Sequence, residues 1–150
     1  MSINDDFDEI MDYAHFWNWS PDWGVVQKVY QSFPDSYSVL TPFAYAYLEE
    51  LIKSTTSEYG IEVLDALGKP RRRKVGIELI NFAISENSSN QNYFALLEKA
   101  KLYFSPSKPE DLGDNRNNVV HGYMHPRFWD KDSFEKLIHF IATLSKYSKF

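Results

Sequence analysis

The sequence predicts an all-α protein, a helical bundle of about five helices. Apolar residues recur at the three- and four-residue spacing of a helix, while the alternating pattern of strands is almost absent. Proline and glycine fall between the helical stretches. With 150 residues the chain is expected to form a single helical domain, 1–150, composed of a Trp-rich part, 1–40, and a bundle, 41–150.

The sequence leaves the structure of the first forty residues open, because Pro21, Gly24 and Pro34 divide them into short pieces. Tryptophans are crowded in the segment HFWNWSPDW, at positions 17, 19 and 23. Nearby charges are acidic, and Trp often anchors a core or a subunit interface. We therefore favour packing for these rings, with stacking on unpaired bases as the alternative.

A helix is predicted from Thr41 to about Tyr59. Thr41 is a suitable cap, Pro42 suits the first helical position, and Gly60 is a natural stop. Its apolar side is expected to be buried and consists of Phe43, Tyr47, Leu48, Leu51 and Ile52.

Two further helices are predicted over residues 71–84 and 92–104, joined by the polar loop 86–92. The expected inward residues are Val75, Leu79, Phe82 and Ala83 in the first, and Phe94, Leu97, Ala100 and Phe104 in the second. The basic run at 71–74 is interpreted as the solvated start of a helix, with a phosphate-binding patch as the alternative.

The chain breaks at SPSKP, residues 105–109, and a helix that is interrupted or late in starting is expected after it because of Gly113. The clearest helix comes last, after a cap at Asp132 or Ser133. Its apolar stripe is Phe134, Leu137, Ile138, Ile141 and Leu144.

Composition limits the function. A net charge of -5 argues against a protein whose whole surface binds nucleic acid, although a local basic patch is compatible with it. Without cysteine there is no disulfide and no thiolate metal site or nucleophile. The acidic start does not resemble a secretory signal, and no apolar run is long enough to cross a membrane. We therefore expect a cytoplasmic protein.

The segment DNRNNVVHGYMHP, residues 114–126, collects polar side chains with chemical potential. On a regular helix Asn117 shares a face with His121, whereas Arg116 lies about 140° from it. The simplest interpretation is a helix end in which Val119 and Val120 pack inward. His125 follows His121 by four residues, but without cysteine or an intervening acid the pair is a weak metal site.

Arg116, Asn117 and His121 fit the pattern R-N-x-x-x-H, which resembles the signature of the HEPN superfamily of small helical-bundle domains. Tyr123 extends the match to R-x-x-x-x-H-x-Y, which is similar to the HepT-type toxin branch. The resemblance covers residues 92–148.

The resemblance implies a metal-independent endoribonuclease, a toxin or phage-defence component, with a composite site at a homodimer interface and no cofactor. His121 would transfer protons, Arg116 would stabilise the phosphate, and Asn117 would orient either His121 or the phosphate. Tyr123 and Asn118 would contact substrate, or Tyr123 would accept AMP from a partner nucleotidyltransferase. An antitoxin is a further possible partner. A non-catalytic HEPN-like binding or dimerisation module is the alternative.

Overall fold

The computed structural model describes residues 2–15, 17–106, 112–121, 125–126 and 129–150, and for Asn118 and His121 the backbone alone. Over this part the protein is all-α, as predicted, with no strand and one isolated bridge between Leu64 and Pro70. None of the described helices is long and apolar enough to cross a membrane.

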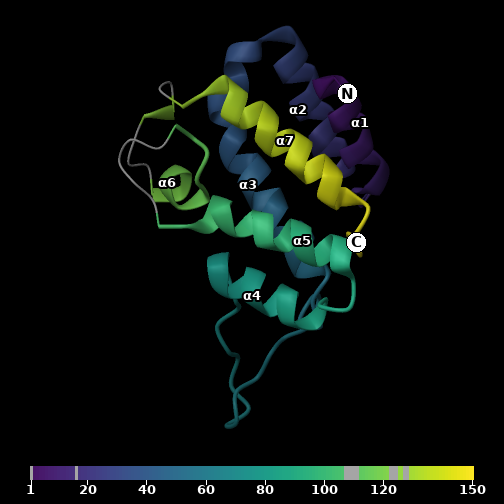
Figure 1. Cartoon of the computed structure of the whole chain (residues 1–150), viewed down its shortest axis with the longest axis vertical. Coiled ribbons are helices and arrows are strands. Elements are labelled where there is room, and N and C mark those ends of the chain that lie inside the picture. The colour runs from purple at the N-terminus through teal and green to yellow at the C-terminus, as the bar shows by residue number, and fades with distance from the viewer. Residues whose placement is uncertain (1, 16, 107–111, 122–124, 127–128) are drawn as a thin grey trace.

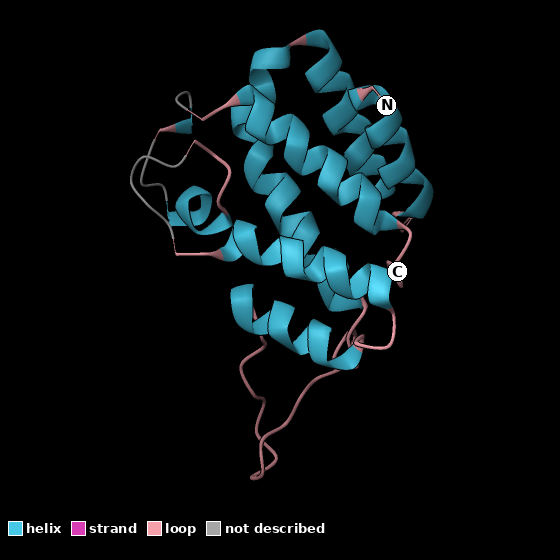
Figure 2. Ribbon diagram, viewed as in Figure 1, coloured by secondary structure: helices cyan, strands magenta, loops and turns pink. Residues whose placement is uncertain are grey.

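The elements are, in order, α1 (Ile3–Tyr13), α2 (Ser20–Ser32), the 3-10 turn η1 (Pro34–Ser36), α3 (Tyr37–Ser54), α4 (Gly76–Glu86), α5 (Gln91–Ala100), the 3-10 turn η2 (Lys101–Phe104), α6 (Arg116–His121) and α7 (Lys131–Ser145) (Figures 1 and 2). In the described part, six of the α-helices have ten residues or more. The prediction of about five was slightly low because α1 and α2 lie in the first forty residues.

The Trp-rich part is helical despite its prolines. Pro21 occupies the first turn of α2, where its missing N–H is not needed for the helix. Trp23 is fully buried, with its ring centroid 5.1 Å from those of both Phe43 and Tyr47. Trp17, by contrast, is 73% exposed. Packing therefore accounts for Trp23, and helix formation here depends on contacts with α3 and α7.

Helix α3 begins at Tyr37 and ends at Ser54, so both predicted ends were wrong. Thr41 is not a cap, because the helix begins four residues earlier, directly after η1. The Thr41 hydroxyl donates to the carbonyl oxygen of Tyr37 at 2.7 Å, inside the helix. At the other end the hydroxyls of Ser54 and Thr55 donate to carbonyl oxygens three residues back. These side-chain bonds compete with the backbone hydrogen bonds that would extend the helix, which explains why α3 ends before Gly60.

Helix α4 begins at Gly76, five residues later than predicted. Gly76 has φ +59°, which separates the preceding extended chain from the helix. Val75 is consequently exposed, while Leu79 and Ala83 are buried as expected. The basic run is therefore not a helix start but part of a loop that projects from the bundle (Figure 1).

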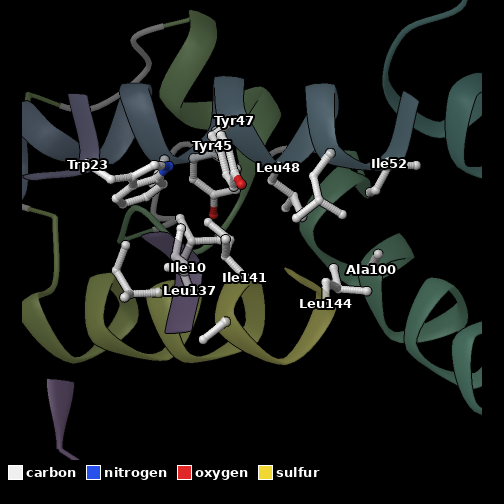
Figure 3. Close-up of a cluster of buried hydrophobic side chains, with 14 of the residues drawn as sticks. Ile10, Trp23, Tyr45, Tyr47, Leu48, Ile52, Ala100, Leu137, Ile141 and Leu144 are labelled. Carbon is white, nitrogen blue, oxygen red and sulfur yellow. The ribbon is translucent and has the colours of Figure 1, made fainter. Parts of the chain in front are cut away.

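The core lies between α3 and α7, and α1 packs against α7 and adds Ile10 to the same cluster. Figure 3 shows Tyr47 and Leu48 of α3 opposite Leu137 and Ile141 of α7. The whole predicted stripe of α7 is buried. Its cap is Asp130 instead of Asp132 or Ser133, since the Asp130 carboxylate accepts from the Ser133 N–H at 3.1 Å.

In α5 the buried aromatic ring belongs to Tyr93, not to the predicted Phe94, which is 36% exposed. Tyr93 stacks on Tyr147 with ring centroids 4.7 Å apart, and its hydroxyl lies 2.9 Å from that of Thr55. A partner from the C-terminal end of the chain therefore decided which residue of the helix points inward.

Candidate functional site

Helix α6 carries the predicted site and lies beside α3 and η2 (Figure 1). As predicted, it starts late, after Gly113 at φ +85°. A Cβ atom at Gly113 would stand 2.8 Å from the Cβ of Trp129, so this turn requires glycine both for its backbone angle and for space.

Two asparagines fasten the start of α6 to the end of η2. The amide nitrogen of Asn115 donates to the carbonyl oxygen of Ser105 at 2.8 Å. That of Asn117 donates to the carbonyl oxygens of Phe104 and Ser105 at 3.2 and 3.1 Å. The carbonyls that η2 leaves without intrahelical donors thereby gain partners, and the helix is fixed in place.

Arg116, the first residue of α6, is held by an ion pair. Its Nη2 lies 3.0 and 3.1 Å from the two carboxylate oxygens of Glu49 on α3, and its Nη1 donates to Asn117 Oδ1 at 3.2 Å. The guanidinium also lies 6.0 Å from the centroid of the Phe104 ring. With a side chain only 16% exposed, Arg116 is set into the surface of the bundle.

The Glu49 carboxylate has a second donor. Its Oε1 accepts from the backbone N–H of Gly76 at 2.9 Å, where α4 begins. One carboxylate thus connects α3, α4 and α6. Nothing in the sequence singled out Glu49, because it lies 67 residues from Arg116 and only the folded chain brings them together.

The ion pair partly neutralises Arg116 but does not exhaust its hydrogen bonds. A guanidinium has five N–H donors in a planar fork, and the contacts with Glu49 and Asn117 do not use all of them. A phosphate oxygen that reached the guanidinium would compete with Glu49 for its charge. Arg116 is therefore suited to a phosphate contact that is weaker than that of an unpaired arginine.

Of the predicted site residues, the structure brings Arg116 and Asn117 into direct contact. Both polar groups of the Asn117 side chain are engaged, one with Arg116 and the other with η2. The side chains of Asn118 and His121, and the whole of Tyr123, lie outside the described residues, so the geometry of the full motif is not described. Val119 is buried, but Val120 is 55% exposed.

A groove of about 850 Å³ lies elsewhere, between α1, α5 and α7. There the Nδ1 of His139 is 3.0 Å from Oδ1 of the buried Asp6, which fixes the orientation of the imidazole. His139 is thus partnered, although its side chain is 59% exposed. Both lysines and carboxylates line the groove, so its charge favours no class of ligand.

Among the described residues no group of three or more His, Asp or Glu side chains is placed to hold a metal ion. Compared with known proteins, the chain matches no protein-family model, no curated protein and no solved structure. The resemblance to HEPN proteins therefore rests on the motif residues alone.

Proposed function

We propose that this protein is a HEPN-type, metal-independent endoribonuclease, a toxin or phage-defence component of the cytoplasm that acts as a homodimer. The observation that carries the proposal is the sequence R-N-x-x-x-H on one short helix, α6, of an all-helical chain. Arg116, at the start of this helix, is partly exposed and held in position by Glu49 and Asn117.

The reaction needs a base, an acid and a cation. The base removes the proton of the ribose 2′-hydroxyl, and the 2′-oxygen attacks phosphorus. The bond from phosphorus to the 5′-oxygen then breaks, and the acid protonates this leaving oxygen. The products are a 2′,3′-cyclic phosphate and a 5′-hydroxyl, with no metal or redox partner required.

His121 is the proton-transfer group in this scheme, and Arg116 stabilises charge on the phosphorane. A single histidine cannot easily reach both sides of an in-line displacement, so two protomers supply one His121 each. Asn118 and Tyr123 are the proposed substrate contacts. In the HepT-like form of the proposal, a partner nucleotidyltransferase silences the enzyme by transferring AMP to Tyr123, and an antitoxin is an alternative silencing partner.

The second candidate is a non-catalytic HEPN-like binding or dimerisation module. It is favoured by the Arg116–Glu49 ion pair and by the hydrogen bonds from Asn117 to η2, because both side chains then have sufficient structural reasons to be present. In such a module the motif would serve to fasten α6 to the bundle.

Cleavage of a labelled RNA in EDTA separates the two functions. His121→Ala should lower the rate by about 10²- to 10⁴-fold, because it removes a proton-transfer group from both halves of a symmetric site. Arg116→Ala should also lower the rate, and Arg116→Lys should restore little of the lost activity, since an ammonium lacks the planar fork. His125→Ala, which removes an exposed histidine four residues along, is the matched control and should retain activity.

Two results would refute the ribonuclease. One is a purified protein that cuts no RNA, and the other is His121→Ala protein that cuts as fast as the parent with unchanged helical circular dichroism. Either result would make the binding module the better account. Sedimentation that shows monomer alone at roughly tens of micromolar would contradict the two-protomer site.

A further inference from the structure

The loop between α3 and α4 forms an ordered arm, which we define as residues 57–75 (Figures 1 and 2). Its turn is closed by Asp65, whose carboxylate accepts from the N–H groups of Leu67 and Lys69 at 2.8 and 3.0 Å. The Arg71 N–H donates to the Val63 carbonyl oxygen at 2.7 Å. These bonds hold the two limbs of the arm together.

The returning limb of this arm is strongly basic. It reads KPRRRK from position 69 to position 74 and contains five of the 16 Lys and Arg residues of the chain. The protein as a whole has a net charge of -5, so this limb is a local reversal of its charge. A concentrated positive segment on an acidic protein is the electrostatic pattern of a polyanion-binding element.

Part of this charge braces the base of the arm. Glu58 pairs with Arg71 and with Lys74, the latter at 2.7 Å. The hydrogen bond from Lys74 holds the pKa of the Glu58 carboxyl below its ordinary value, so the pair is charged at neutral pH. The other three cations, Lys69, Arg72 and Arg73, are exposed, and no ion pair within the described residues involves them.

The arm joins the bundle next to the candidate site. Its last residue, Val75, is followed by Gly76, whose N–H donates to Glu49 at 2.9 Å. The same carboxylate binds Arg116 at 3.0 Å. A strand of nucleic acid lying along the arm would therefore approach the bundle near Arg116.

We propose that the arm binds the phosphate backbone of single-stranded RNA through Lys69, Arg72 and Arg73 and leads the strand towards Arg116. This inference rests on the proposed ribonuclease function and adds a substrate-binding element to it. The arm has no aromatic residue beyond Tyr59, so it offers cations to phosphates without a platform for stacking bases. Arginine forks suit phosphate oxygens.

An acidic protein surface is the competing occupant, since Leu67 at the turn is 82% exposed and would suit an apolar contact. RNA is favoured because the exposed cations Lys69, Arg72 and Arg73 lie within five residues on one limb, whereas the apolar residues are dispersed over the arm. Leu67→Ser therefore serves as a control within the arm and should leave RNA affinity unchanged.

The test is fluorescence anisotropy with a labelled single-stranded RNA of about 20 nucleotides, in full-length protein carrying His121→Ala to prevent cleavage. Lys69→Ala, Arg72→Ala and Arg73→Ala together should weaken binding by at least about tenfold at low salt. The slope of log affinity against log salt should fall by about 2, at about 0.7 for each phosphate contact.

The matched control carries Lys28→Ala, Lys99→Ala and Lys136→Ala, which remove the same charge from exposed positions on the helices of the bundle. It should bind nearly as the parent does. Three results would each overturn the inference. The two triple variants could lose RNA affinity equally, or Leu67→Ser could lose as much affinity as the arm triple. The third is arm-dependent binding of a polyglutamate peptide that is tighter than the binding of RNA.

The failure of this inference is distinguishable from the failure of the proposed function. A protein that binds RNA through the arm but never cleaves it refutes the nuclease and supports the arm. A protein that cleaves RNA with unchanged affinity and rate in the arm triple refutes the arm and supports the nuclease.

Discussion

Replacing Glu49 by Ala tests the contact that joins three helices at the candidate site. The change removes the carboxylate that binds Arg116 at 3.0 Å and the Gly76 N–H at 2.9 Å. The side chains of Glu49 and Arg116 are only 17% and 16% exposed, so water replaces the lost contacts incompletely. We expect the free energy of unfolding to fall.

The size of the loss follows from the geometry. At 3.0 Å and an effective dielectric constant of about 20, the attraction between the two charges is about 5.5 kcal/mol before desolvation is subtracted. Removing one member of a buried pair costs about 3–5 kcal/mol, and partial exposure reduces this. The Gly76 hydrogen bond adds about 1 kcal/mol. Glu49→Ala should therefore cost about 2–4 kcal/mol, and Glu49→Gln, which keeps an acceptor, about half as much.

Urea denaturation of the variants measures this loss. Glu50→Ala is the control, because Glu50 makes a looser pair with Lys53 at 3.7 Å and is 33% exposed, so its loss should stay below about 1 kcal/mol. If Glu49→Ala costs no more than Glu50→Ala, the role assigned to this carboxylate is wrong. The same variants inform function, because Glu49→Gln frees the charge of Arg116 and should raise RNA affinity only if Arg116 meets phosphate.

Two other predictions concern stability. Gly113→Ala places a Cβ 2.8 Å from that of Trp129, at φ +85°. Gly68 has a similar φ of +76° but open space around it, so Gly68→Ala should lower the free energy of unfolding by roughly 1–2 kcal/mol and Gly113→Ala by well over that. Equal losses in urea denaturation would contradict the close approach. Burial raises the pKa of Tyr93 to about 12 from an ordinary value of 10.0. The unfolded chain therefore loses this proton first, so the contribution of Tyr93 to stability should be constant below pH 10 and be lost between pH 10 and about 12, as urea midpoints can measure. Tyr93→Phe should lessen that decline, and an unchanged pH profile would refute it.

Sequence periodicity alone determined the fold class and much of the core. The stripe of α7, the buried side of α3 from Tyr47 to Ile52, and the late start of α6 after Gly113 were all predicted correctly. These features are local, because spacing along one helix decides which residues share a face, and a backbone at positive φ favours glycine. The residue types at positions 116, 117 and 121 predict a candidate site on α6, and RNA cleavage is the test of that prediction.

Only the tertiary structure decided the helix ends, the residues that pair across the bundle and the arm at 57–75. Helix α2, whose local pattern is weak, forms because Trp23 is buried against other parts of the chain, whereas α1 also has a local signal, the capping box between Ser2 and Asp5. The ion pair of Arg116 with Glu49 and the stacking of Tyr93 on Tyr147 join residues far apart in sequence. Local spacing carries no information on such partners, because they meet only when the helices pack and surrounding side chains exclude water.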